Sequence, residues 1–235
     1  MVWSVLQSAT SQASATTVAV TFATANVQRG NKIIAYVSVG ATTAPAVTSV
    51  KDAALNTWTQ VGNANQANAR IYIFALDVPS EDVGTKPTLT ATSSGTPGLG
   101  IVIQEVSGLI AGNTTAMCDG AAAALTGTAA STGNPTYSTT QAGLYLVSAY
   151  GDFGAGNTIV KASRWTMDKN SNNASVDSNC IVQYKNSTAG SETDGFTSAD
   201  TNGWAVAEVA FKLAIPIPPR ITQSVAVMPF RAGSW

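Results

Sequence analysis

The chain has 235 residues and a formal net charge of −1, and only 11% of its residues are charged. An average soluble protein has roughly 25% charged residues, so the many Thr, Ser, Asn and Gln side chains must supply solubility. No block of Lys or Arg is present, which argues against nucleic acid and against an anionic membrane surface as partners. Its apolar runs fall far short of the ~20 residues that a membrane-spanning helix needs.

The N-terminal stretch "MVWSVLQSATSQ" has no basic segment followed by an apolar one, so we expect no signal peptide. The two cysteines, Cys118 and Cys180, are far apart and form no CxxC motif. They are able to close a disulfide, but the spacing favours two isolated, buried thiols.

Strand signals dominate from the N-terminus onward, as runs rich in Val, Ile, Thr and Tyr that Gly, Asn, Asp and Ser interrupt. In the first half they occupy residues 16–22, 31–39, 56–62, 69–78, 86–94 and 100–106. No segment keeps a helical period over three turns. Even the Ala-rich stretch 119–132 lacks an amphipathic stripe and favours an extended or looping path.

The pattern inside these runs predicts how each strand is covered. In 16–22, Val18, Val20 and Phe22 share one face, which is typical of a half-buried antiparallel strand. The runs 31–39 and 69–78 are apolar on both faces and therefore need cover on both sides. The sequence thus predicts an all-β protein, an antiparallel, jelly-roll-like β-sandwich.

The second half repeats the order of the first. Its matching segments are 143–151, 163–167, 179–185, 195–200 and 203–213. Trp58 returns as Trp165, each followed by Thr, and Glu105 returns as Glu208, each five residues after a Gly. This series predicts an internal duplication over residues 1–213, with repeat one at about 1–110 and repeat two at about 111–213. We prefer one merged sandwich to two tandem ones, because strands that are apolar on both faces need the other repeat as cover.

Residues 214–235 form a Pro-rich segment that we expect to be an extended C-terminal arm. The arm is rich in apolar residues, including Phe230 and Trp235. It either folds back on its own sandwich or lies along a neighbouring chain, and we favour the neighbour and hence self-association. Trp235 is the tryptophan that we expect at an interface.

Glu105 interrupts an apolar strand and raises the possibility of acid catalysis. The chain has no His, which excludes Ser-His-Asp and Cys-His catalysis and His-ligated metals. Glu105 and Glu208 take equivalent places in the two repeats, which favours structural carboxylates that each bind a buried donor. The alternative is a pair of glycosidase acids about 5–10 Å apart. We predict no catalytic residue, no cofactor and no metal.

Two further motifs have competing interpretations. The stretch 168–179 begins like a calcium loop but has Asn where such a loop needs Gly at position six and Glu at position twelve, so we expect a polar loop. Trp58 and Trp165 suit either sugar-binding platforms or the core, and their repeat-equivalent positions favour the core.

Several segments together resemble a known family. These are "RGNKIIAYVSVG", "TSVKDAALNTWTQVG", "ARIYIFALDV" and "GIVIQEVSGL", with "GWAVAEVAFKL" in the second half. Over roughly residues 10–213 the chain resembles a two-repeat β-sandwich family of phage virion proteins and bacterial surface proteins. It departs from the family in "LYLVSAYG", which lacks the usual Asp, and in its arm.

The resemblance implies a non-enzymatic structural role in a bacteriophage virion, as a decoration, minor capsid or tail-appendage protein. The partners would be major capsid or tail subunits, with assembly in the host cytoplasm, where no signal peptide is needed. One alternative is a carbohydrate-binding adhesin-type module with glycan partners. A less favoured one is a β-sandwich glycoside hydrolase, which would lose turnover in Glu105→Gln or Glu208→Gln.

Overall fold

The computed structural model describes residues 2–128, 135–154, 158–171, 175–193, 195–198 and 202–214. In this part the chain is all-β, with antiparallel strand pairs and one short 3-10 turn, η1 (Thr115–Met117). The predicted antiparallel β-sandwich is therefore confirmed. The Pro-rich arm, including Phe230 and Trp235, lies outside the described residues.

The strands fall into two sets along the chain. The first half comprises β1 (Ser4–Ser14), β2 (Thr17–Thr21), β3 (Lys32–Gly40), β4 (Val47–Lys51), β5 (Thr59–Asn65), β6 (Ala69–Asp77), β7 (Thr88–Ser93) and β8 (Gly98–Ser107). The second half comprises β9 (Ala123–Gly127), β10 (Tyr137–Thr139), β11 (Tyr145–Asp152), β12 (Ile159–Val160), β13 (Thr166–Ser171), β14 (Cys180–Asn186), β15 (Gly190–Glu192), β16 (Thr197–Ser198) and β17 (Trp204–Phe211).

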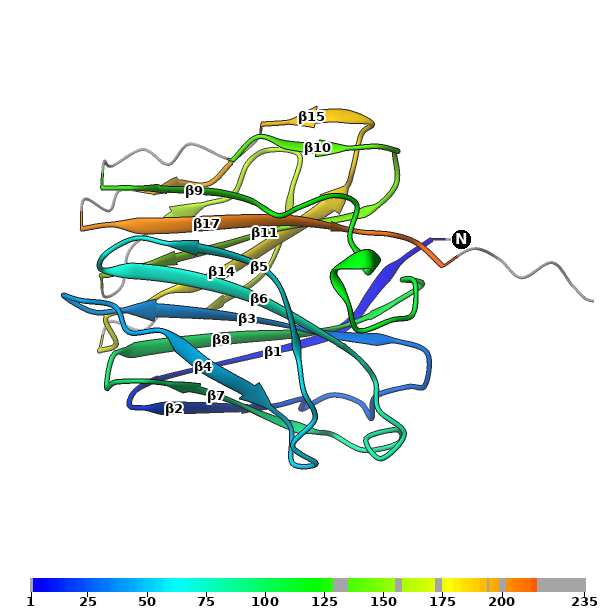
Figure 1. Ribbon diagram of the computed structural model, residues 1–235, viewed down its shortest axis with the longest axis horizontal. Coiled ribbons are helices and arrows are strands. Elements are labelled where there is room, and N and C mark those ends of the chain that lie inside the picture. The colour runs from blue at the N-terminus through cyan, green and yellow to red at the C-terminus, as the bar shows by residue number, and fades with distance from the viewer. Residues whose placement is uncertain are drawn as a thin grey trace, which may run out of the picture.

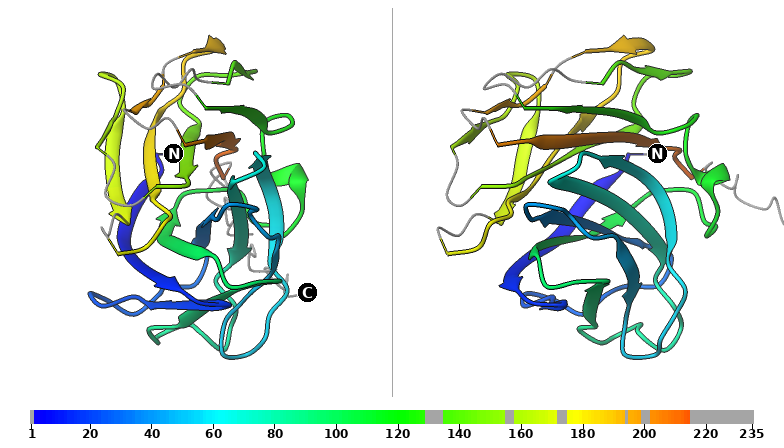
Figure 2. Two further views of the ribbon diagram at one scale, coloured as in Figure 1. Left: turned by 90° about the vertical axis from the view of Figure 1, so that its left-hand side faces the viewer. Right: turned by 60° about the vertical axis from the view of Figure 1, so that its left-hand side comes forward.

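These strands build four layers. The first inner sheet has the order β1-β8-β3-β6-β5, and the second inner sheet has the order β13-β14-β11-β17-β9. The first outer sheet, β2-β7-β4, covers the free face of the first inner sheet, and the outer strand pairs β10-β15 and β12-β16 cover that of the second. Figure 1 shows the first outer sheet at the bottom and β10-β15 at the top. The turned views keep this order (Figure 2).

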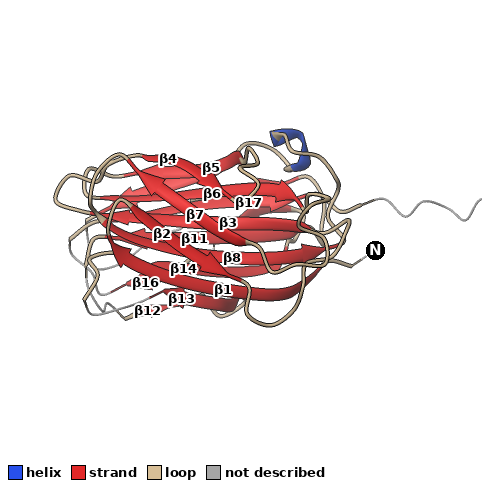
Figure 3. Ribbon diagram, turned by 90° about the horizontal axis from the view of Figure 1, so that it is seen from below, coloured by secondary structure: helices blue, strands red, loops and turns tan. Residues whose placement is uncertain are grey.

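The central core lies between the two inner sheets. Ile34, Tyr36 and Ile73 of the first inner sheet pack there with residues such as Val147 and Ala207 of the second. A second core lies between the first inner and first outer sheets, and β2, β7 and β4 cross in front of the inner strands when the molecule is seen from below (Figure 3). The two halves thus merge through the faces of their sheets, not by exchanging strands.

Burial follows directly from this layering. Every residue of β3 and of β11 is buried, because each strand lies in the middle of an inner sheet with a layer on either side. Strand β2, by contrast, alternates between exposed and buried residues, since only one of its faces meets another layer. The predicted two-sided cover of the run 31–39 and the half-burial of 16–22 are both confirmed.

The two inner sheets share one connectivity. Read from the edge strand that comes first in each half, their orders are β1-β8-β3-β6-β5 and β9-β17-β11-β14-β13, so corresponding strands occupy corresponding places. Gly30 and Gly143, with φ of 83° and 82°, precede β3 and β11. Trp58 and Trp165 immediately precede β5 and β13. A duplication would produce this correspondence, although the duplication itself stays a prediction.

A polar network crosses the central core. The hydroxyl groups of Tyr36 and Tyr145, one from each half, both donate to Oε1 of Gln104. Gln104 Nε2 donates to Asp168 Oδ2 at 2.8 Å, and Ser8 Oγ donates to Asp168 Oδ1 at 2.9 Å. Burial raises the pKa of both tyrosines well above the ordinary value, so both remain neutral donors.

Candidate functional site

Glu105 is a buried structural acceptor. Its side chain is 1% exposed on β8. One carboxylate oxygen accepts from Gln7 Nε2 at 2.7 Å, and the other accepts from the backbone N–H of Gln28 at 2.8 Å and from Asn31 Nδ2 at 2.6 Å. Charged acceptors form the stronger class of hydrogen bond, and three donors occupy this one. Glu105 therefore fixes the loop between β2 and β3 to β8.

Glu208 is fully buried on β17, where it lies opposite Ser148. The neighbouring side chains of Ala207 and Val209 belong to the central core, so that of Glu208 points the other way, toward the outer strand pairs. Burial is the main cause that raises the pKa of Tyr137 to about 12, and the charge of Glu208 adds to it. The Glu208 side chain thus lies between the second inner sheet and the outer strand pairs that cover it.

The two glutamates do not share a site. Ile101 and Ile103, which have the same orientation as Glu105 on β8, pack under the first outer sheet. Glu208 faces the opposite outer layer, so both inner sheets, about 10 Å apart as stacked sheets are, lie between the carboxylates. Glycosidase acids face one cleft at a separation of about 5–10 Å. The geometry provides no such pair.

The glutamates also differ in register. Glu105 pairs with the third residue after Gly30, whereas Glu208 pairs with the fifth residue after Gly143. Measured from these two left-handed glycines, the carboxylates lie two residues apart along corresponding strands, on the same face. Glu105 and Glu208 therefore lie on corresponding faces of their sheets, as the spacing predicts, but they do not occupy corresponding positions along the strands.

Asp119 anchors a loop in the second half, as Glu105 anchors a loop in the first. Its Oδ2 accepts from the backbone N–H of Thr140 at 2.6 Å, and its Oδ1 accepts from Thr140 Oγ1 at 2.7 Å. Thr140 lies in the loop between β10 and β11, which corresponds to the loop that Glu105 holds. Sequence comparison missed Asp119 because it lies before β9, outside every repeated segment.

Trp58 and Trp165 both lie in hydrophobic cores, as the sequence predicts. Trp58 is 7% exposed and packs under the first outer sheet, and Trp165 is 2% exposed and packs under β10. The Nε1 atoms of both have no hydrogen-bond partner within the described residues. Neither ring is an exposed platform, although Trp58 lines a small cavity.

The second half contains a buried ion pair that the sequence did not reveal. Lys185 Nζ lies 2.8 Å from Glu192 Oε2, and both side chains are buried. The same ammonium lies 4.5 Å from the centre of the Trp165 ring. Glu192 also accepts from Thr188, through its backbone N–H and its hydroxyl. In the first half, Lys32 pairs with Asp77 on the neighbouring strand.

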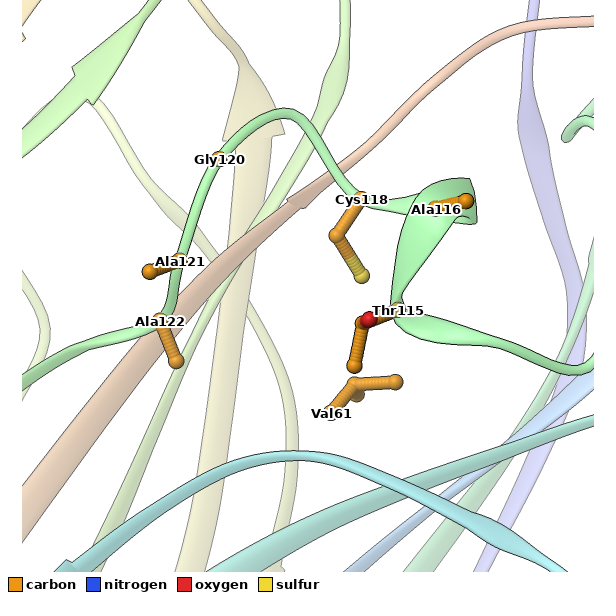
Figure 4. A pocket seen from close by; sticks show the side chains of 7 residues that line it. All are labelled: Val61, Thr115, Ala116, Cys118, Gly120, Ala121 and Ala122. Atoms are coloured by element: carbon orange, nitrogen blue, oxygen red, sulfur yellow. The ribbon is translucent and has the colours of Figure 1, made fainter.

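A hollow lies where strands β5 and β9 border the 3-10 turn, with a cavity volume of about 540 Å³. Its lining residues are mostly small: Val61, Thr115, Ala116, Cys118, Gly120, Ala121 and Ala122. Figure 4 shows the side chains of Cys118 and Ala122 pointing into the space beside Val61. Burial raises the pKa of Cys118 to about 11, so at neutral pH this thiol is protonated and a poor nucleophile.

Cys118 and Cys180 are free, buried thiols, which confirms the preferred interpretation of the two cysteines. Asp168, the first residue of the calcium-like stretch, is engaged by Gln104 and Ser8. In the described part of the chain, no three His, Cys, Asp or Glu side chains are placed to hold a metal ion.

Among the residues that the structure describes, no helix is long and apolar enough to cross a membrane. Neither protein-family models, nor curated proteins, nor solved structures yield a match to the chain.

Proposed function

We propose that the protein is a non-enzymatic structural component of a bacteriophage virion, a decoration, minor capsid or tail-appendage subunit that docks on other virion proteins. The proposal rests first on the order of motifs over roughly residues 10–213, which resembles the two-repeat virion family. A subunit in this role needs a stable fold and exposed sheet edges for docking, and it needs no catalytic turnover.

One structural observation carries the proposal further. The two acids at matching places in the repeats, Glu105 and Glu208, face opposite outer layers, and Glu105 is bound by three donors of its own chain. Carboxylates committed in this way stabilise loops and cores. A sandwich hydrolase would instead need its two acids in one cleft.

Mass spectrometry of purified phage particles tests the proposal. The particles are prepared from the lysate of the bacterial strain that carries the gene, and are washed at high salt to remove adhering protein. We expect peptides of this chain in the particles, at a constant ratio to the major capsid protein. Their absence from washed particles, with the protein present in the lysate, would contradict a virion role.

The C-terminal arm provides a second test. We expect deletion of residues 216–235 to leave the sandwich folded, because the strands that build the inner sheets and their cores lie within residues 4–211. The truncated chain should keep its circular dichroism spectrum and lose docking or self-association, measured by light scattering after size-exclusion chromatography. Unfolding of the truncated chain would instead assign the arm to the chain's own core.

A carbohydrate-binding module is the second candidate, because one observation favours it. Trp58 and Phe74 line a small cavity together with polar side chains.

A further inference from the structure

A pocket opens at one edge of the first half. It lies where the last strand of the first outer sheet, β4, passes the start of β5, and its cavity volume is about 240 Å³. The residues that line it are Thr48, Ser49, Val50, Lys51, Asn56, Thr57, Trp58 and Phe74. Pockets for drug-sized ligands span roughly 300–1,000 Å³, so this one has room for a single ring and not for a longer chain.

The wall of the pocket combines apolar rings with polar groups. Trp58 and Phe74 are each 7% exposed, while Thr48, Lys51 and Thr57 are exposed at the rim. Trp58 is thus more than nine-tenths buried, and its Nε1 donor has no partner within the described residues. The indole nitrogen is itself inaccessible, so a ligand would meet the apolar parts of this wall and the polar groups at the rim.

Asn56 is held in one orientation at the same rim. Its Nδ2 donates both to Asp52 Oδ2 at 3.0 Å and to Glu81 Oε1 at 2.9 Å, which uses both amide hydrogens. Its backbone N–H donates to Asp52 Oδ1 at 3.0 Å. The side-chain Oδ1 is therefore left as an oriented acceptor for a group that enters the pocket.

The turn that carries Asn56 is strained. Leu55, the preceding residue, has a φ of 61° and is the one non-glycine residue with positive φ in the described part of the chain. The left-handed conformation costs an ordinary residue roughly 1–2 kcal/mol, and such strain concentrates at functional sites. Here the strained turn is what brings the amide of Asn56 to the pocket.

We propose that this pocket binds one uncharged sugar ring. The parts of Trp58 and Phe74 that line the pocket offer an apolar wall to the C–H groups of a pyranose, while Asn56 Oδ1, the threonine hydroxyls and Lys51 offer acceptors and donors to its hydroxyls. The proposal is independent of the virion role, since a glycan-binding pocket serves a phage particle and a cell-surface module equally.

The second half supplies an internal control. Trp165 occupies the corresponding place before β13, but its ring is covered by the chain's own Lys185, with Nζ 4.5 Å from the ring centre. The two indoles therefore have the same backbone setting, but Trp58 lines a pocket whereas an ammonium lies over Trp165.

Nuclear magnetic resonance of the tryptophan indole N–H groups tests the proposal on the full-length protein. The probes are methyl glycosides of glucose, galactose and mannose, and N-acetylglucosamine, titrated into the millimolar range. Trp58→Phe and Trp165→Phe assign the two signals. We expect the Trp58 signal to shift saturably with at least one probe and the Trp165 signal to stay in place.

Two variants separate binding from folding. Asn56→Ala removes the acceptor but keeps the backbone bond to Asp52, and we expect it to weaken the affinity about tenfold, the effect of one hydrogen bond. Gln60→Ala, an exposed change on β5 outside the pocket, should leave the affinity unchanged. The proposal is overturned if no probe moves the Trp58 signal, if Trp165 moves equally, or if Asn56→Ala binds as tightly as the parent.

Discussion

Trp58 and Trp165 occupy the same place in the two halves, but different kinds of side chain pack against them. Thr59 pairs with Ala75 and Thr166 pairs with Tyr184, so Trp58 is level with the next residue on β6, Leu76, and Trp165 is level with Lys185 on β14. In the first half Leu76 joins the apolar core around Trp58. In the second, an ammonium lies over the ring. The backbone register is retained while the chemistry of the cover changes.

The outer layers explain this difference. The first half has a continuous three-stranded cover, whereas the described residues of the second half form the two short pairs β10-β15 and β12-β16. A continuous sheet supplies enough apolar side chains to cover a ring. Under the interrupted cover, the Lys185–Glu192 pair fills the corresponding space, with Glu192 supplied by β15. A desolvated cation over a tryptophan ring contributes up to about 2 kcal/mol, which offsets part of the cost of burying it.

Removing one member of the ion pair should have the largest effect. Glu192→Leu leaves the Lys185 ammonium buried without its carboxylate, and breaking a buried pair in this way costs about 3–5 kcal/mol. We expect that loss in the free energy of unfolding, measured by urea denaturation. The matched control Glu81→Leu removes an exposed carboxylate and should cost much less. Equal losses in both variants would contradict the distinction.

Replacing both members should make the second half resemble the first. In Lys185→Leu/Glu192→Leu no charge is left buried, and apolar replacements of buried ion pairs are often neutral or stabilising. We therefore expect the double variant to regain most of the stability that Glu192→Leu loses, in the same denaturation assay. Additive losses from the two single changes would show that the pair is not the unit that matters.

The two loop anchors should differ in strength. Glu105→Ala leaves three donors without their acceptor and should cost about 2–3 kcal/mol, while Asp119→Ala frees the two donors of Thr140 and should cost about 1–2 kcal/mol. Hydrogen exchange checks the location of each effect. The amide of Gln28 should lose protection only in the first variant and that of Thr140 only in the second.

The smallest effect concerns pH. Burial acts to raise the pKa of Glu192, but hydrogen bonds from Lys185 and Thr188 outweigh it and lower the pKa below the ordinary value of 4.5. A lowered folded-state pKa stabilises the protein above that ordinary value, and the stabilisation is lost as the pH falls through the folded-state pKa. Between pH 6 and pH 3 the parent should therefore lose more stability than Lys185→Leu/Glu192→Leu, measured by thermal unfolding. Equal pH dependence would contradict this.

The sequence predicts the central strands well and the edges poorly. The runs that match β3 and β6 are apolar on both faces, which a sequence records directly. Strand β1 escaped prediction because Ser4–Ser14 is mostly Ser, Thr and Gln, and it gains its place only by pairing with β8 at the sheet edge. Backbone pairing of that kind carries no compositional signal.

The candidate residues show the same limit. The sequence favours a structural role for Glu105, through the missing His and the matching place of Glu208. Its partners do not follow from the sequence, because Gln7, Gln28 and Asn31 come from distant segments. The two-residue offset between Glu105 and Glu208 does not follow from the sequence either, because bulges and loop lengths alter the strand register without changing the order of motifs.

The amide of Gln104 has a consequence for how the chain unfolds. One oxygen of the first half accepts a hydrogen bond from its own Tyr36 and another from Tyr145 of the second half, inside the core that both inner sheets share. If either half opened alone, the hydrogen bond between Tyr145 and Gln104 would be lost and one entire apolar sheet face would be exposed to water. The two halves are therefore thermodynamically one unit, and a single cooperative transition should describe the melting of the whole sandwich.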